Sequence, residues 1–302
     1  MVRVALVKGD DRKANVRQAL ELIADDIDLK GRRPVIKVNF VSTYNPLSAT
    51  HPDAVRAIVE FLKDRGKKDI AVGEGATIGN TSRGFREYGY EVLAKEYDLE
   101  LIDLNDPDSF KVVYVIHPDM MPHPVKLAQT MLDPNNYIIS ATRIKTHLQV
   151  GVTLTAKNVI MGAIMVMDKN RLHPTQAGNK VLDYNLFNVM QHLHIDIGVL
   201  DGFEGMEGNG PVNGEPVDHR LAIAGTDYLA VDRVGTEVMG ADFDDIRYLN
   251  FLCDWGFGEG DLSKIEVIGE TIESCRRQYK MSPGFVRMRR QESKGQYQEL
   301  AV

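Results

Sequence analysis

The feature that most constrains the fold of this chain is the alternation of short apolar segments with amphipathic segments of helical spacing. Residues 2–9 (VRVALVKG) and 33–41 (RPVIKVNFV) have the apolar, β-branched character of buried strands. Residues 13–24 and 50–66 carry apolar side chains at helical spacing, and each follows one of these strands. Such alternation predicts βαβ units, because a helix usually makes the crossover between parallel strands.

The same alternation continues through most of the chain. Further strands are expected at residues 68–76, 99–105, 110–118, 135–140, 196–202, 220–225 and 264–270, and further helices at 82–98, 186–195 and 226–240. The pattern predicts an α/β fold with Rossmann-like βαβ units around a mostly parallel sheet. We expect residues 1–283 to form this domain, as one unit or as two lobes that divide near residue 145. Residues 284–302 are expected to form a polar C-terminal tail.

Composition argues against several classes of protein. The formal net charge of -7 argues against general binding to nucleic acid or to a membrane surface. No apolar run reaches the ~20 residues of a membrane-spanning helix, and the N-terminal residues become charged too early for a signal peptide. The sequence therefore predicts a cytoplasmic protein without nucleic-acid or membrane partners, and it leaves homo-oligomerisation open.

The cysteine content limits the possible cofactors. The chain has two cysteines, Cys253 and Cys275, and they form no Cys-x-x-Cys motif. An iron–sulfur cluster with four cysteine ligands cannot be built within one such chain, so no intrachain cluster is expected. The cofactor stays unknown at this stage, and a divalent metal remains open.

Open α/β sheets bind ligands beyond the carboxyl ends of their strands, so polar residues directly after apolar strands are candidates for a site. Lys37 and Asn39 lie at the end of the second expected strand, where a cation and an amide suit an anionic ligand. The alternative is a lysine that reaches solvent from an edge strand. Glu74 and Gly75 follow the next strand in the turn VGEGA. This turn either brings backbone amides to a phosphate and Glu74 to a base or metal-ligand position, or is a tight turn without a ligand.

The segment 143–162 (RIKTHLQVGVTLTAKNVIMG) places polar side chains between two apolar runs. Lys145 and His147 are two residues apart, so they point to the same side if this part is a strand. Lys157 and Asn158 are expected in the first turns of a helix that a preceding threonine caps. A lysine near the positive end of a helix needs a reason, such as an anion bound between these groups.

An acidic, glycine-rich segment follows the strand that ends at Asp201. It carries Glu204, Glu207 and Asn209, and its glycines allow backbone to approach a ligand closely. Carboxylates there either hold a metal or serve as acid and base, and the alternative is a solvated surface loop. Because the cations of 143–162 need partners, we expect Asp201, Glu207 and Asn209 to lie next to that segment.

Two smaller groups have a simpler structural explanation. Lys169, Arg171 and His173 lie near the end of an expected helix, where basic residues are ordinary C-terminal caps. Asp227 lies at a strand-to-helix junction, and helix capping explains it. Asp232, one turn further on, is not explained in this way and stays a candidate.

The chain resembles a widespread prokaryotic family called domain of unknown function 362. The resemblance rests on the segments KVNFVS, THPDAVRAIVEFL, VGEGA, IKTHLQVGVTLTAKNVIMG, LDGFEGMEGNGPVNGEPV and AGTDYLAVDRVGTEVMG, in this order between residues 35 and 269. Many members of that family carry ferredoxin-type cysteine motifs and are described as iron–sulfur proteins. This chain departs from that pattern, so the resemblance does not carry a cluster-dependent role over to it.

These observations predict an enzyme that acts on a small anionic metabolite, a carboxylate or a phosphate, by Lys/His/Glu acid–base chemistry, with a metal as an open addition. The expected catalytic residues are His147, Lys145 and Glu207. The expected ligand-binding residues are Lys37, Asn39, Glu74, Gly75, Lys157, Asn158, Asp201 and Asn209. The alternative is a non-catalytic binding or accessory protein, such as a redox or metal-handling partner.

Overall fold

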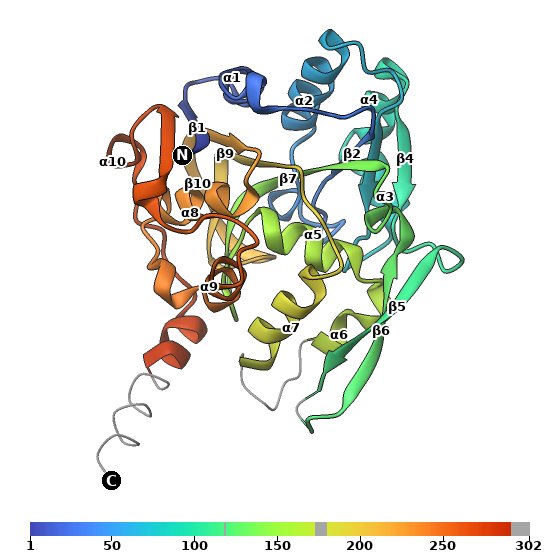
Figure 1. Ribbon diagram of the computed structural model, residues 1–302, viewed down its shortest axis with the longest axis vertical. Helices are drawn as coiled ribbons and strands as arrows, with labels where there is room; N and C mark the ends of the chain where they lie inside the picture. Colours follow the sequence, from blue (N-terminus) through green and yellow to red (C-terminus); the bar gives the residue numbers. More distant parts are fainter. Residues whose placement is uncertain (118, 173–179, 291–302) are drawn as a thin grey trace.

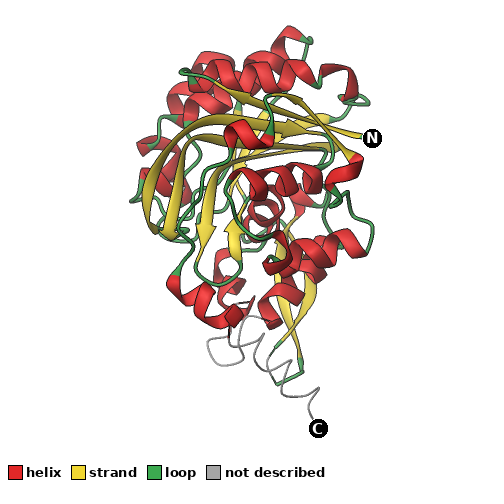
Figure 2. Ribbon diagram, turned by 90° about the vertical axis from the view of Figure 1, so that its left-hand side faces the viewer, coloured by secondary structure: helices red, strands yellow, loops and turns green. Residues whose placement is uncertain are grey.

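A computed structural model describes residues 1–117, 119–172 and 180–290 of the chain, and these form a sheet with helices on both faces (Figures 1 and 2). Within these residues the sheet has nine strands: β1 (Val2–Lys8), β2 (Arg33–Lys37), β3 (Ala71–Glu74), β4 (Glu100–Asp103), β7 (Asn136–His147), β8 (Gly151–Thr153), β9 (Ile197–Asn209), β10 (Asn213–Gly225) and β11 (Ile265–Gly269). Their order is β11-β1-β10-β9-β7-β2-β3-β4, and β8 pairs with the end of β7. Pairing is parallel except at β10 and β8, so the expected α/β fold with a mostly parallel sheet is confirmed.

Two layers of helices cover this sheet. One layer holds α1 (Arg12–Leu22), α2 (Pro52–Asp64), α3 (Thr81–Glu87) and α4 (Tyr90–Tyr97), and the other holds α5 (Thr155–Ala163), α7 (Lys180–Met190), α8 (Tyr228–Val238) and α9 (Arg247–Asp254). The short helices are α6 (Lys169–Leu172), α10 (Ile272–Cys275), η1 (Ala24–Asp26), η2 (Pro46–Ser48), η3 (Gln129–Met131), η4 (Val166–Asp168), η5 (Phe243–Asp245) and η6 (Leu262–Lys264).

Side-chain alternation along the strands divides the core between the two faces. Val35 and Ile138 pack in the cluster under α5, α7 and α8, whereas the adjacent Ile36 and Ile139 pack in the cluster under α1 and α2. Successive strand residues point to opposite faces, so a strand that is covered on both sides must be apolar along its whole length. This is the physical reason for the continuous apolar runs in the sequence.

The expected strand at 110–118 forms, but outside the main sheet. It is β5 (Phe110–Ile116), which pairs in antiparallel fashion with β6 (Pro122–Ala128) in a hairpin that extends from the body of the molecule (Figure 1). No strand was expected at β6, because Pro122 and Pro124 cannot donate hydrogen bonds. Prolines are tolerated in an edge strand of this kind.

Two of the expected helices, at residues 82–98 and 50–66, differ in detail from the structure. The helix expected at 82–98 is divided into α3 and α4 at Gly89, which has φ 80°. A residue in the left-handed region ends a helix, and glycine adopts it without steric penalty. Helix α2 is capped by the side chain of His51, whereas Thr50 accepts a hydrogen bond from the amide of Asn39 and donates one to the carbonyl of Ala141.

The domain boundaries predicted from the sequence lie in packed parts of the structure. Residue 145 lies inside β7, and all 12 residues of this strand are buried, so the sheet is continuous there. Residues 283–290 are helical, and Phe285 and Arg289 are buried within the expected polar tail. Within the described residues, no helix is long and apolar enough to cross a membrane.

The glycine-rich segment after Asp201 was expected to be a loop, and this was wrong. It forms the outer arms of the β9–β10 hairpin, which is paired out to Asn209 and Asn213. The glycines have a packing reason, because a side chain at Gly205 would meet the Tyr279 hydroxyl at 2.2 Å, and one at Gly202 would meet Leu221 at 2.4 Å.

Candidate functional site

A pocket lies at the carboxyl ends of three strands that are neighbours in the sheet. Strand β7 ends at His147, β2 ends at Lys37 and β3 ends at Glu74. The pocket has a cavity volume of about 80 Å³ and opens to solvent. It is lined by Asn39, Phe40, Val41, Glu74, Thr77, His147, Thr153, Lys157, Met161, Gly162, Lys169 and Pro211.

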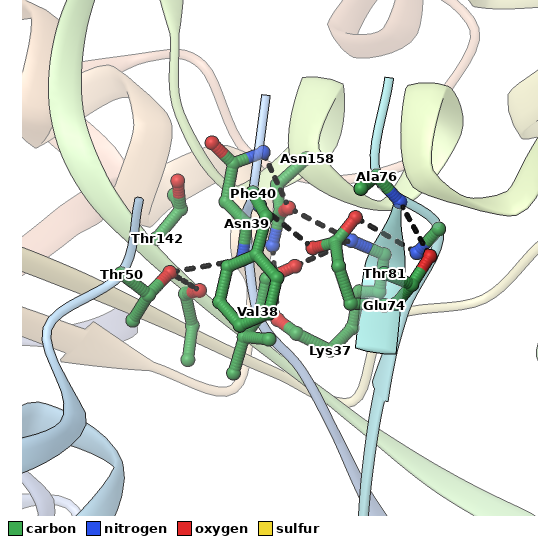
Figure 3. Close-up of polar contacts among 12 residues, drawn as sticks. Lys37, Val38, Asn39, Phe40, Thr50, Glu74, Ala76, Thr81, Thr142 and Asn158 are labelled. Atoms are coloured by element: carbon green, nitrogen blue, oxygen red, sulfur yellow. Dashed lines mark hydrogen bonds and ion pairs between the residues drawn. The ribbon is translucent and has the colours of Figure 1, made fainter. Parts of the chain in front are cut away.

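A buried ion pair forms one wall of this region (Figure 3). The Nζ of Lys37 donates to Glu74 Oε2 at 2.9 Å, and both side chains are buried. Glu74 also accepts from the amides of Phe40 at 2.9 Å and Gly75 at 2.8 Å. Burial lowers the pKa of Lys37, while the charge of Glu74 opposes that shift. Because the Glu74 carboxylate is held by three donors, it supports the pocket wall rather than offering a free base.

Two asparagines connect this ion pair to Lys145. Asn158 Oδ1 accepts from Lys37 Nζ at 3.2 Å and from Asn39 Nδ2 at 3.1 Å (Figure 3). Asn39 Oδ1 accepts from Lys145 Nζ, which also donates to the carbonyl of Ser48 at 2.7 Å. Lys145 is fully buried and does not line the pocket, and burial lowers its pKa well below the ordinary value. The network therefore joins β2, β3, β7 and α5 behind the pocket.

Gly162 on α5 makes room for Lys37. A Cβ atom at Gly162 would lie 1.9 Å from Lys37 Cε and 2.3 Å from Lys37 Nζ, so a side chain there would force the Lys37 side chain to move. The glycine thus lets α5 pack onto the ammonium group of Lys37 where it pairs with Glu74. A glycine inside a helix costs about 1 kcal/mol relative to alanine, and here close packing explains its presence.

Lys157 differs from the other lysines of the cluster. It lines the pocket and is 5% exposed, and among the residues that the structure describes its ammonium group has no hydrogen-bond or ion-pair partner. Burial, followed by repulsion from Lys169, lowers its pKa to about 7. A lysine with this pKa is partly a neutral amine at physiological pH. It is thus able both to attract an anion and to accept a proton.

Lys169 places a second amine in the pocket wall. Its Nζ donates to the carbonyl of Gly75 at 2.5 Å and to Thr77 Oγ1 at 3.1 Å. Burial lowers its pKa to about 8, while the attraction of Glu74 opposes the shift. From the sequence this residue was interpreted as a possible helix cap, and the structure places it in the pocket instead.

His147 lines the pocket from the end of β7. Its Nδ1 accepts hydrogen bonds from the amides of Gln149 at 3.1 Å and Val150 at 3.2 Å. A nitrogen that accepts from two amides carries no proton. The neutral ring of His147 therefore carries its proton on Nε2. The strand geometry places Lys145 and His147 on the same side of β7, as expected for residues two apart.

The backbone amides of this region are engaged by the protein. The first residue of α5 is Thr155, and its amide and that of Ala156 donate to the Asp232 carboxylate at 2.7 and 2.9 Å. Asp232 therefore caps α5 from helix α8, and the expected threonine cap is absent. Burial raises the pKa of Asp232 to about 7, against the hydrogen bonds that favour its charged form. In the VGEGA turn, the amide of Gly75 is bound by Glu74 in the same way.

The acidic segment lies beside residues 143–162, as expected, because β9 pairs with β7 at Arg143–Asp201 and Lys145–Met206. The acidic side chains, however, have partners outside the pocket. Asp201 is paired with Arg12 at 3.2 Å, and Glu204 with Arg143 at 2.9 Å. Glu207 is paired with Lys280 at 3.1 Å. Asn209 Oδ1 accepts from the hydroxyl of Ser282 at 3.2 Å. None of these four residues lines the pocket, and the hairpin that carries them contributes Pro211 instead.

The remaining candidates lie at structural positions. Asp227 caps α8 by accepting from two backbone amides, and Arg171 is paired with Asp168 at 3.2 Å. His173 lies outside the described residues. Cys253 and Cys275 are free thiols on α9 and α10, and burial raises the pKa of Cys253 to about 12.

Comparisons with known proteins point to one family. The family described as "Domain of unknown function (DUF362)" matches residues 35–237. The "Thylakoid-associated protein sll1697" of Synechocystis sp. is 26% identical over 219 residues, which are 70% of this chain and 64% of that relative. A crystal structure of a Thermotoga maritima protein from the Northeast Structural Genomics Consortium matches 82% of this chain and 60% of the other, with a TM-score of 0.43 and 12% identity.

Proposed function

The chain belongs to the DUF362 family, whose description assigns no activity, and we propose that its pocket binds a small carboxylate or phosphate and acts on it by acid–base chemistry. The pocket is small, with a cavity of about 80 Å³, so it suits a small anionic group rather than a large ligand. Lys157 and Lys169 line the pocket, and Glu74, whose charge is neutralised by Lys37, is the single carboxylate among the lining residues that the structure describes. This charge balance favours an anionic ligand.

One observation carries the proposal: Lys157 is buried at the pocket without a partner among the described residues. An unpaired buried ammonium group is unfavourable because it loses its hydration, and a bound anion would replace the lost water. Lys37, in contrast, has Glu74 as its partner, and Lys145 has Asn39 and Ser48. We therefore expect an anionic ligand to bind at Lys157, the lysine that has no partner among the described residues.

The proposed roles follow from protonation states. The Lys157 amine, with a pKa of about 7, is poised to take a proton from the ligand near neutral pH. Lys169 and His147 line the pocket, and we assign them the role of holding the anionic group. Lys145 and the Lys37–Glu74 pair would position the walls without touching the ligand. Glu207 has no part in this proposal, because it is paired with Lys280 away from the pocket.

The cellular setting is also a proposal. A small anionic metabolite as partner fits a cytoplasmic protein, while the curated relative is described as thylakoid-associated.

The test is a thermal melt of the protein with a panel of phosphates and carboxylates at constant ionic strength. A ligand at a hundred times its dissociation constant stabilises the folded state by about 2.7 kcal/mol, so at least one anion should raise the melting temperature of the wild type. Lys157→Met should not respond to that anion. For any anion that responds, proton exchange at its carbon atoms, followed by NMR in D₂O, tests the acid–base step.

A matched variant controls for general charge effects. Lys68 is an exposed lysine outside the pocket, and Lys68→Met should respond to the anion as the wild type does. If the anion raises the melting temperature of Lys157→Met as much as that of the wild type, the anion binds outside the proposed pocket site. Binding without proton exchange would favour the alternative, a non-catalytic binding protein.

A further inference from the structure

The tip of the β5–β6 hairpin carries a second group of polar side chains. His117 follows β5, Asp119 lies in the turn, and His123 is in β6. One ligand atom from each of these residues lies within 4.8 Å of the other two. We propose that these three side chains bind a divalent transition-metal ion at the tip of the hairpin.

The hairpin register brings the two imidazoles together. The amide of His117 donates to the carbonyl of Met121, and His123 pairs with Val115. His117 and His123 are therefore diagonal neighbours on one face of the hairpin. Their rings are stacked with centroids 4.3 Å apart and an interplanar angle of 3°. Two protonated rings would repel each other in this arrangement, whereas two neutral rings are both metal ligands.

The turn places a carboxylate beside these rings. Asp119 Oδ1 accepts from the amide of Met121 at 2.9 Å, which fixes the direction of the carboxylate. The Nδ1 atom of His117 lies 3.1 Å from this oxygen. Yet Nδ1 is shielded from solvent and makes no hydrogen bond within the described residues, so the contact lacks hydrogen-bond geometry. An imidazole nitrogen and a carboxylate oxygen that face each other at this distance are both ligands that one metal ion can accept.

The donor set identifies the class of metal. Two imidazoles and one carboxylate suit Zn²⁺ and its first-row neighbours, whereas Mg²⁺ and Ca²⁺ prefer oxygen ligands throughout. Zinc–ligand bonds of about 2.0–2.2 Å require tetrahedral ligand atoms roughly 3.5 Å apart, so the side chains must close in by about 1 Å. The turn is exposed, with Asp119 and Met120 at the surface, so this movement disturbs no packed core.

This site is separate from the pocket of the proposed function. The opposite end of the hairpin is held to the segment before Lys169, where the amide of Lys126 donates to Asp168 Oδ2 at 2.9 Å. The metal-binding group lies where β5 ends and β6 begins, and none of its residues lines the pocket. A variant that loses metal binding at the hairpin tip can therefore be distinguished from a variant that loses anion binding in the pocket.

The test uses the full chain without a polyhistidine tag, after treatment with a chelator. Titration calorimetry with Zn²⁺ should give one tight site, and Co²⁺ should give the visible absorption of a nitrogen–oxygen site. His123→Ala and Asp119→Asn should each weaken Zn²⁺ binding about tenfold or more, because each removes a ligand. The anion response of these variants should equal that of the wild type.

An exposed histidine elsewhere serves as the control. His192 lies after α7, and His192→Ala should keep the Zn²⁺ affinity of the wild type. If the hairpin of His123→Ala is disturbed, His123→Gln keeps a polar side chain of similar length while removing the imidazole. Zn²⁺ affinity that is unchanged in all tip variants, or absent in the wild type, would overturn the proposal.

Discussion

Replacement of Lys157 by methionine should change the pH dependence of stability. Methionine has a similar length and no charge, so Lys157→Met keeps most of the apolar packing and removes the ammonium group. Lys157 is 5% exposed and has no partner among the described residues, so no carboxylate is left unpaired by the change. The substitution therefore isolates the free energy of burying one lysine charge.

The magnitude follows from two pKa values. The pKa of Lys157 is lowered to about 7 in the folded protein. In an unfolded chain it is about 10.4. Between these values the unfolded state binds more protons, so the free energy of unfolding rises with pH by about 1.4 kcal/mol per unit. Over the full range this amounts to about 5 kcal/mol. Below pH 7 both states are charged and the whole penalty is present.

The measurement is urea denaturation of the wild type and Lys157→Met at several pH values between about 6.5 and 9.5. Groups that titrate equally in both proteins cancel in the difference between their free energies of unfolding. Lys157→Met should be the more stable protein near pH 7, and its advantage should shrink steadily as the pH rises. Lys68→Met, which removes an exposed lysine, should show a difference that does not depend on pH.

Two results would refute this reasoning. A difference that stays constant with pH would mean that Lys157 titrates in the folded protein as it does in the unfolded chain. A variant that is several kcal/mol less stable than the wild type at pH 7 would mean that the ammonium group has a structural partner.

Two further predictions concern the Lys37–Glu74 ion pair at the pocket and Asp232 at the start of α5. Lys37→Met should lower the free energy of unfolding by about 3–5 kcal/mol, because it leaves the buried charge of Glu74 without its partner. The double variant with Glu74→Gln should lose less than the sum of the two single variants, and strict additivity in urea denaturation would contradict the coupling. For Asp232 the pKa is raised to about 7, so the folded state binds more protons between about pH 4 and 7. Wild type should therefore lose about 1.4 kcal/mol per pH unit relative to Asp232→Asn as pH rises through this range, and a constant difference in urea denaturation would contradict the burial.

The strands and their polar ends could be predicted because their signals are local. An apolar run followed by Lys37, or by Lys145 and His147, indicates a strand end from neighbouring residues alone. Parallel strands share one edge at their carboxyl ends, so Lys37, Glu74 and His147 gather there once the strands are parallel. The sequence could thus indicate the edge of the sheet without knowledge of the strand order.

The side-chain partners of the acidic residues could not be predicted because they come from distant parts of the chain. Gly205 is required by the hydroxyl of Tyr279, and Glu207 is paired with Lys280, both more than 70 residues later. In the sequence alone, the glycines around Glu207 cannot be distinguished from the glycines of a flexible loop. Lys169 was interpreted as a helix cap for a similar reason. Its partners Gly75 and Thr77 lie far away in the sequence, on the turn after β3.

The pocket lysines differ in how the fold compensates for their burial. Lys37 is held by Glu74 and Asn158, and the missing side chain at Gly162 leaves space for it. Lys145 donates to Asn39 and to a backbone carbonyl. Lys157 receives no such support from the described residues, although it lies in the first turn of α5, where the helix dipole also disfavours a cation. The fold therefore stabilises the buried charges of Lys37 and Lys145 but not that of Lys157. An unfavourable buried charge of this kind is typical of ligand sites, where stability is commonly given up for function.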